Sequence, residues 1–142
     1  MAARYNGLEF KTALEARWAA YFDLVGWSWW VNPVEVQGWK PDFKVSIPCD
    51  HSECDGSHTL LVAVLPVLSV DDFGQHPCTT LRYEVLDDRG EWLADAGAAF
   101  GMKPWISQWE MSHGAGGGLF DAAEFGVDEP GVLWEKAGTL VY

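Results

Sequence analysis

The stretch LLVAVLP, residues 60–66, decides the fold because it is apolar without interruption. It belongs to a longer run, from Thr59 to Val67, in which apolar and polar residues do not alternate. A short run of this kind is typical of a central strand that is covered on both faces of a sheet. The sequence therefore predicts that residues 59–67 lie deep inside a β-sheet.

Two further strands are predicted upstream of this run. The stretch DFKVSI alternates, with Asp42, Lys44 and Ser46 on one face and apolar residues on the other, which is the pattern of a half-buried strand. The stretch WSWWV, residues 27–31, is short, aromatic and followed by Asn and Pro, which also favours a strand. The buried run thus has at least two predicted strands before it in the chain.

Residues 6–26 predict the best helix of the sequence. Asn6 is in a position to cap it, Glu9 follows three residues later, and Gly26 supplies a stop signal. Apolar residues recur at intervals of three and four residues: Phe10, Leu14, Trp18, Phe22 and Val25. Such a stripe has to pack on another element, and the predicted sheet provides the surface.

The second half of the chain gives weaker signals. Residues 69–77 predict a short helical turn that begins after Ser69. Residues 79–93 are compatible either with a helix or with a pair of strands turning at the Asp-Arg-Gly of residues 88–90. The GAGGG stretch at 114–118 predicts a flexible surface loop, and the tail from 131 to 142 a turn of helix and a last strand.

We therefore expect one domain, residues 1–142, of the α/β class, with a mixed central sheet flanked by helices and Gly-rich additions after residue 90. The length of 142 residues and the apolar fraction of 49% suffice for a single core. The formal net charge of −12 would repel a phosphate backbone unless the few basic residues cluster on one face. An acidic surface serves solubility, and it can also attract basic proteins or imitate DNA.

No membrane association is expected, because the longest aliphatic run is too short to cross a bilayer and contains Pro66. The first ten residues lack the apolar segment of a signal peptide, so a cytoplasmic location is expected, which is the host cytoplasm if a phage encodes the protein. The three cysteines cannot all pair with one another. Under reducing conditions they are expected to be thiols or metal ligands.

A zinc site is one interpretation of the stretch CDHSECDGSH and the HPC that follows downstream. Zinc prefers thiolate and imidazole ligands in a tetrahedron. The ligand set that we select from these residues is Cys49, Cys54, His58 and Cys78. The alternative is a group of reduced cysteines with surface histidines. His113 stands alone beside Ser112 and matches no triad motif.

A family resemblance rests on three features of the first half of the chain. Glu15 lies in a helical stretch, KPDF occupies residues 40–43, and the aliphatic strand begins at residue 60. Together they resemble the PD-(D/E)xK nuclease superfamily, especially its small phage-type members, over roughly residues 5–70. The resemblance implies a restriction-endonuclease-like core. It also implies an acid from the first helix, the Asp of the PD strand, and an E-x-K on the next strand that hold Mg²⁺ and orient a water.

The match is incomplete where the chemistry should be. Glu15 corresponds to the helix acid and Asp42 to the PD acid, but Ala63 and Leu65 stand where the second acid and the Lys belong. A lost ligand or lysine costs on the order of 10²- to 10⁴-fold in rate. We therefore predict a degenerate site without hydrolysis. The alternative is an active Mg-dependent endonuclease in which Lys44, two residues after Asp42, has taken over the role of the lysine.

A kept scaffold, an emptied site and a negative charge favour binding over cleavage. The function we predict is that of a phage-type protein that binds and inhibits or modulates a host protein of nucleic-acid machinery or defence, in the manner of an anti-CRISPR or a DNA mimic. Contact with nucleic acid itself stays open. Trp39, Trp105 and Trp109 are the expected anchors at the interface. A zinc-stapled structural protein of a phage particle is a third interpretation.

Overall fold

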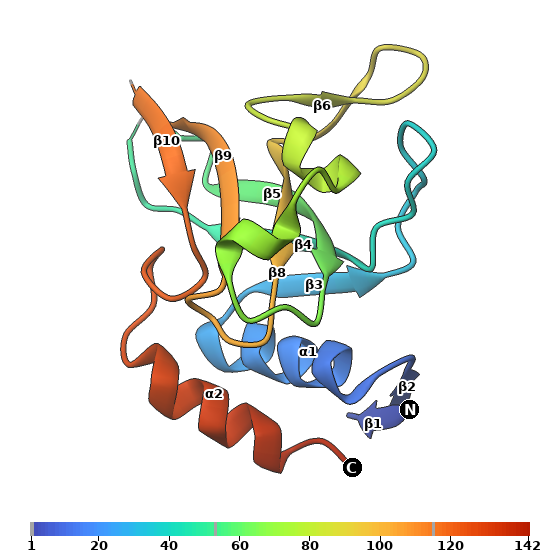
Figure 1. Ribbon diagram of the computed structural model, residues 1–142. Coiled ribbons are helices and arrows are strands. Elements are labelled where there is room, and N and C mark those ends of the chain that lie inside the picture. Colours follow the sequence, from blue (N-terminus) through green and yellow to red (C-terminus); the bar gives the residue numbers. More distant parts are fainter. Residues whose placement is uncertain (1, 53, 115) are drawn as a thin grey trace.

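A mixed six-stranded sheet forms the centre of the computed structural model, which describes residues 2–52, 54–114 and 116–142 (Figure 1). The strand order is β10-β9-β8-β5-β4-β3. Its strands are β3 (Ser28–Val31), β4 (Phe43–Pro48), β5 (Ser57–Val64), β8 (Ala96–Phe100), β9 (Ser107–His113) and β10 (Gly116–Phe120). The pair β5 and β8 is parallel, and the other neighbours are antiparallel.

Strand β5 lies in the interior of the sheet and is buried on both faces, as its apolar sequence predicts. Leu60 and Val62 belong to one hydrophobic cluster, whereas Leu61 and Ala63 belong to a second cluster on the opposite face. All four side chains are at most 3% exposed. The prediction of a central strand is therefore confirmed, with the strand ending at Val64 rather than at residue 67.

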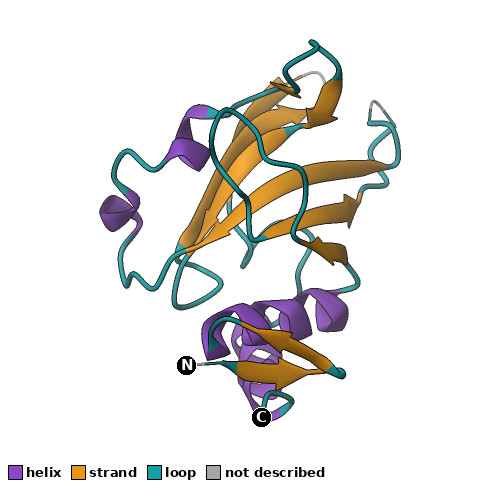
Figure 2. Ribbon diagram, turned by 90° about the vertical axis from the view of Figure 1, so that its right-hand side faces the viewer, coloured by secondary structure: helices purple, strands orange, loops and turns teal. Residues whose placement is uncertain are grey.

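The first cluster lies between the sheet and two helices, α1 (Ala13–Val25) and α2 (Pro130–Thr139). Figure 2 shows both helices, together with the N-terminal hairpin, on one side of the sheet. Trp18 of α1 donates its indole N–H to the carbonyl of Gly101 at 2.9 Å, and Tyr21 donates its hydroxyl to the carbonyl of Ala122 at 2.6 Å. These bonds satisfy the polar atoms of two large buried rings, so the aromatic face of α1 packs without a desolvation penalty.

The second cluster is covered by short elements: the 3₁₀ turns η1 (Val70–Phe73) and η2 (Pro77–Thr80), and the strand pair β6 (Val85–Leu86) and β7 (Trp92–Ala94). The turn η2 approaches β8 so closely that a Cβ added at Gly97 would lie 2.5 Å from the carbonyl oxygen of Cys78. Ser69 caps η1 by accepting a hydrogen bond from the N–H of Asp71. The predicted helical turn is thus confirmed. The stretch 79–93 begins with the last two residues of η2 and then contains the strand pair rather than a helix.

The predicted start of the first helix is wrong. Residues 3–10 form a hairpin, β1 (Ala3–Tyr5) and β2 (Leu8–Phe10), and the helix begins only after Thr12. Asn6 and Gly7 both have positive φ, 51° and 80°, which is what a two-residue type I′ turn requires. The sequence Asn-Gly is a strong signal for this turn, and it outweighs the capping pattern that we had assigned to Asn6.

The helix that follows has its own caps. Thr12 accepts a hydrogen bond from the N–H of Glu15 at 3.1 Å, and Gly26 ends the helix with a φ of 84°. The predicted helix is therefore confirmed from Ala13 to its end before Gly26, and is wrong over residues 6–12.

The Gly-rich region after residue 90, which we expected to be an addition to the core, contributes strands to the central sheet. Residues 116–120 form the edge strand β10, paired with β9, where we had predicted a flexible loop; Ala115 of that loop lies outside the described residues. The tail forms the helix α2 and no further strand within the described residues. The α/β class with a mixed sheet and helices is thus established. In the described ranges no helix combines the length and the hydrophobicity that a bilayer span requires.

Candidate metal centre

Four side chains with metal-binding atoms converge at one edge of the sheet. Cys49 follows the end of β4, Cys54 lies in the loop after it, His58 is the second residue of β5, and His113 is the last residue of β9. Their ligand atoms all lie within 4.8 Å of one another. Figure 1 shows the loop between β4 and β5 beside the hairpin of β9 and β10, which is how residues distant in sequence meet.

The three distances from His113 to the other ligand atoms are close to those of a tetrahedral zinc shell. The Nδ1 atom of His113 lies 3.2 Å from Nε2 of His58, 3.5 Å from Sγ of Cys54 and 3.8 Å from Sγ of Cys49. Four ligands at ordinary zinc distances in a tetrahedron would be separated by about 3.3 Å for two nitrogens and about 3.6 Å for nitrogen and sulfur. The four atoms are therefore close enough to one another to hold one metal ion.

The surroundings of His58 fix how its ring faces the cluster. Its Nε2 atom points to His113, while Nδ1 lies 3.9 Å from a carboxylate oxygen of Asp95. Asp95 is itself held by the N–H of Thr59, and the His58 side chain is almost fully buried. A carboxylate behind a ligating imidazole is the usual arrangement at protein metal sites. Burial lowers the pKa of His58, which favours the neutral imidazole that binds metals.

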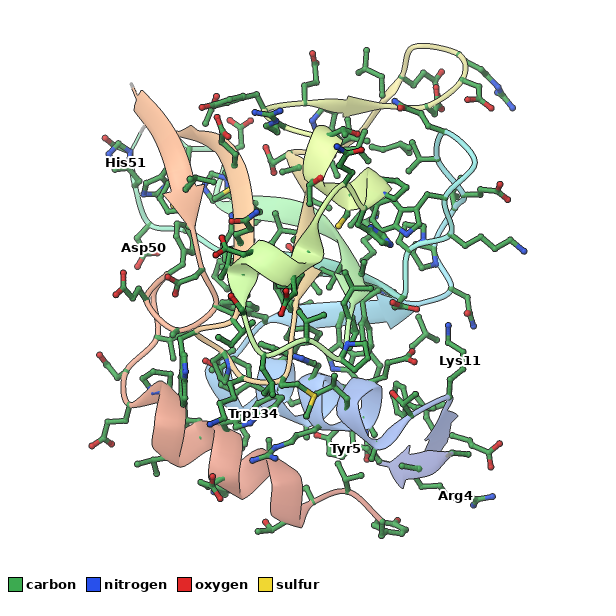
Figure 3. The ribbon with its side chains drawn as sticks, in the orientation of Figure 1. Arg4, Tyr5, Lys11, Asp50, His51 and Trp134 are labelled. Atoms are coloured by element: carbon green, nitrogen blue, oxygen red, sulfur yellow. The ribbon has the colours of Figure 1, made fainter. Side chains whose placement is uncertain are left out.

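A cavity of about 690 Å³ adjoins the cluster. It is lined by Cys49, His113 and the neighbouring His51, and its other wall carries Phe120 and Phe125. The rings of His51 and His113 are 5.1 Å apart. Figure 3 shows Asp50 and His51 at the outer edge of the molecule, so this side of the cluster faces solvent.

The selected zinc set contained Cys78, and the structure places His113 there instead. Cys78 is the buried residue of η2 itself and belongs to the hydrophobic cluster on the other face of the sheet, with its Sγ 3.0 Å from Nδ1 of His76. Burial raises the pKa of its thiol to about 12, so this cysteine is a protonated core residue. Cys49, Cys54 and His58 are brought together as the sequence suggested, but His113 carried no local signal.

The predicted nuclease residues meet at the other end of β5. Asp42 directly precedes β4, and its Oδ2 atom accepts a hydrogen bond of 2.8 Å from the N–H of Val64. Its Oδ1 atom accepts a bond of 3.0 Å from the ammonium of Lys11. Glu15 of α1 is 8% exposed, and burial, together with the charge of Asp42, raises the pKa of its carboxyl group. The helix acid and the PD acid are therefore neighbours in space.

The remaining nuclease positions are occupied by hydrocarbon. Ala63 is 1% exposed and lies with Trp39 and Phe73 in the second hydrophobic cluster, against which Leu65 also packs. The Nζ atom of Lys44, the candidate for a migrated lysine, lies over the ring of Trp30, 5.4 Å from the centroid. Among the described residues, the lysine that forms an ion pair with Asp42 is Lys11.

These residues do not fit the Mg²⁺ site that the resemblance implies. Mg²⁺ needs carboxylate oxygens that are free to enter an octahedral shell. Both oxygens of Asp42 already accept hydrogen bonds, one of them from a cation, and Ala63 offers no oxygen. The donors that could hold a metal therefore lie at the other end of the strand.

The three Trp residues selected as anchors differ in exposure. Trp39 is 8% and Trp109 2% exposed, and both belong to hydrophobic clusters, so neither ring is available to a partner. Trp105 is 47% exposed, with the ammonium of Lys103 5.4 Å from its ring centroid. Two further exposed indoles, Trp30 and Trp92, were not selected.

No protein-family model matches the chain, and neither a curated protein nor a solved structure matches it. The resemblance to nucleases therefore rests on the residues and elements described above.

Proposed function

We propose that this chain is a zinc-stapled binding protein on a nuclease-like scaffold that does not cleave nucleic acid. In this proposal it is a phage-type protein that binds and modulates a host protein of nucleic-acid machinery or defence. The observation that carries the proposal is the hydrocarbon at the end of β5 beside Asp42, where Ala63 and Leu65 replace an acid and a lysine. Phosphodiester hydrolysis in the resembled family requires charged groups at both positions.

Zinc is the metal that the donor set favours. Two thiolates and two imidazoles in a tetrahedron are typical of structural zinc, whereas Mg²⁺ and Ca²⁺ prefer oxygen. A shell with four protein ligands has no open position for a reactive water. Zinc would therefore tie the loop between β4 and β5 to the end of β9, and it would serve stability rather than catalysis.

The charge of the chain supports a protein partner over nucleic acid. A net charge of −12 repels phosphate, and it attracts the basic surfaces with which nucleic-acid-binding proteins hold their substrates. Trp105 offers a large exposed ring of the type that dominates binding energy at interfaces. A competitor for such a basic surface needs binding groups but no active site.

A cleavage assay tests the absence of catalysis. Wild-type protein and the Asp42→Ala variant are incubated with linear and supercoiled DNA in Mg²⁺ and in Mn²⁺. We expect no cleavage above the background of the variant. Metal-dependent cleavage that disappears in Asp42→Ala would overturn the proposal.

One observation favours the enzyme alternative, because an amine does reach Asp42: the ammonium of Lys11 at 3.0 Å. A Mg-dependent endonuclease in which Lys11 acts as the catalytic lysine would lose its activity in both Lys11→Met and Asp42→Ala. A protein without catalysis gives the same negative result for all three chains.

Binding is tested by affinity capture with matched variants. Wild-type protein, Trp105→Ala and Trp92→Ala are used as baits, since the last removes an equally exposed indole elsewhere on the surface. We expect one protein to be retained by wild type and Trp92→Ala and weakened at least tenfold with Trp105→Ala, and the complex to re-form from purified components. Equal retention by all three baits would remove Trp105 from the interface.

A further inference from the structure

A small pocket near the N-terminal hairpin is lined by polar and apolar residues. Among the described residues that line it, Lys11 is the only basic one. The pocket has a volume of about 180 Å³, and its polar lining residues besides Lys11 are Glu9, Glu15, Asn32 and Asp42. The Lys11 side chain is 75% exposed along its length, whereas that of Asp42 is 17% exposed. Figure 3 shows Lys11 extending from the N-terminal hairpin region toward the sheet.

We propose that the ammonium of Lys11 is a built-in cation that holds the place of a divalent metal between Glu15 and Asp42, and that removing its charge creates a Mn²⁺ or Mg²⁺ site. This inference deepens the proposed function and rests on it, because an ammonium at this place would keep a divalent ion away from the two carboxylates. The ammonium of Lys11 would thus account for the difference between this pocket and the Mg²⁺ site of the resembled family.

The carboxylates need a cation. Glu15 is nearly buried, and Asp42 is held in place by the N–H of Val64, so the two negative charges cannot move apart freely. The charges of Asp42 and Glu15 both raise the pKa of Lys11, with the hydrogen bond to Asp42 as the largest cause. Glu9, by contrast, is 64% exposed and has Arg4 at 3.9 Å, so it has a counter-ion of its own.

The fold fixes Lys11 at this place. It lies between the end of β2 at Phe10 and the helix cap at Thr12, both of which are set by hydrogen bonds. A lysine ammonium is a compact charge that occupies a single oxygen-lined position, much as a small metal ion does. Carboxylate and amide oxygens are also the ligands that Mn²⁺ and Mg²⁺ prefer, so charge removal leaves a hard donor set without its cation.

The test measures Mn²⁺ binding by the zinc-loaded protein, with the loss of the free Mn²⁺ signal in electron paramagnetic resonance as the readout. Lys11→Met keeps the apolar stem and removes the charge, whereas Lys11→Arg keeps the charge. We expect wild type and Lys11→Arg to bind Mn²⁺ at least tenfold more weakly than Lys11→Met, which should bind one ion. Adding Asp42→Asn to Lys11→Met should abolish that binding.

Each other outcome contradicts the inference. If Lys11→Met binds Mn²⁺ no better than wild type, the lysine does not hold the place of a metal. If wild type already binds one Mn²⁺ and loses it with Asp42→Asn, metal and lysine do not compete. Zinc content and circular dichroism of every variant show whether the chain is folded. DNA cleavage by wild type would overturn the proposed function, whereas Mn²⁺ binding tests the role of Lys11 alone.

Discussion

The two ends of strand β5 carry different chemistry. At its beginning, His58 joins two cysteines and His113 in a cluster whose ligand atoms all lie within 4.8 Å of one another. At its end, roughly 20 Å away for six residues of strand, Val64 lies beside a carboxylate that is paired with Lys11. Side chains that can bind a metal lie at both ends. Among the described residues, only the first end has four ligand atoms, none of which is paired with a lysine or arginine.

The comparison shows that proximity of ligands does not suffice for a metal site. The first end has four converging atoms of the types that zinc prefers, and none of the four side chains pairs with a Lys or Arg among the described residues. The second end has two carboxylates, but the ammonium of Lys11 pairs with Asp42, and the apolar side chains of Ala63 and Leu65 offer no further ligand. We therefore expect metal removal to affect the first end strongly and the second end not at all.

The largest effect is expected from loss of the metal centre. If zinc is present at about 1,000 times its dissociation constant, binding stabilises the fold by about 4 kcal/mol, or on the order of 10–15 °C in Tm for a chain of this size. His113→Ala should lose both the bound zinc and this increment. Cys78→Ala, the control, should keep one zinc per chain. Elemental analysis and thermal melts measure both, and zinc loss in Cys78→Ala alone would contradict the assigned ligand set.

The next largest effect is expected from a charged side chain introduced among the apolar residues at the end of β5. Ala63→Glu places a carboxylate in a fully buried position without a partner, which should cost at least about 3 kcal/mol of unfolding free energy. Leu65→Glu, at a half-buried position just after the end of this strand, should cost clearly less. Urea unfolding measures both values. Equal stability of Ala63→Glu and wild type would mean that the position is open to water or to a cation.

Removal of the Asp42 side chain should have a moderate effect. Asp42→Ala leaves the N–H of Val64 without its acceptor, at a cost of about 1–3 kcal/mol. Asp42→Asn keeps an oxygen at that place and should retain most of the stability while losing the ion pair, which at an exposed lysine contributes little. If both variants unfold at the same urea concentration, the hydrogen bond to Val64 does not contribute.

The smallest effect concerns the pH dependence of stability. The pKa of Glu15 is raised from its usual 4.5 by burial and by Asp42, so the folded chain binds more protons than the unfolded chain between 4.5 and the raised value. The contribution of Glu15 to the free energy of unfolding is therefore fully present below 4.5 and falls as the pH rises through this window. Glu15→Gln should show a flatter profile there than wild type. A fall of the same size in both proteins would assign the dependence to other groups.

The sequence predicted the elements whose pattern has one physical solution. An uninterrupted apolar run such as residues 60–63 is typical of a strand buried on both faces, and the alternation of residues 42–47 is typical of a half-exposed strand. The hairpin at Asn6 was missed because its turn residues also fit a helix cap. Strand β10 was missed because glycines have low intrinsic strand preference, and pairing with β9 forms the strand in spite of it.

The metal cluster was predictable only in its local part. Cys49, Cys54 and His58 lie within ten residues, and their spacing indicated a site. His113 is separated from His58 by 55 residues, and it reaches the cluster because β9 pairs with β8 in one register. No spacing rule encodes that register, so Cys78 was the nearer choice in sequence although it lies on the opposite face of the sheet.

Anomalous diffraction tests the contrast between the two ends of β5 most directly. Crystals of the zinc-loaded wild-type protein would be soaked in Mn²⁺, and difference maps collected at the zinc edge and at a wavelength sensitive to manganese. We predict one zinc peak among Cys49, Cys54, His58 and His113, and no peak between Glu15 and Asp42. A manganese peak at the two carboxylates, or the absence of zinc from the cluster, would contradict the account.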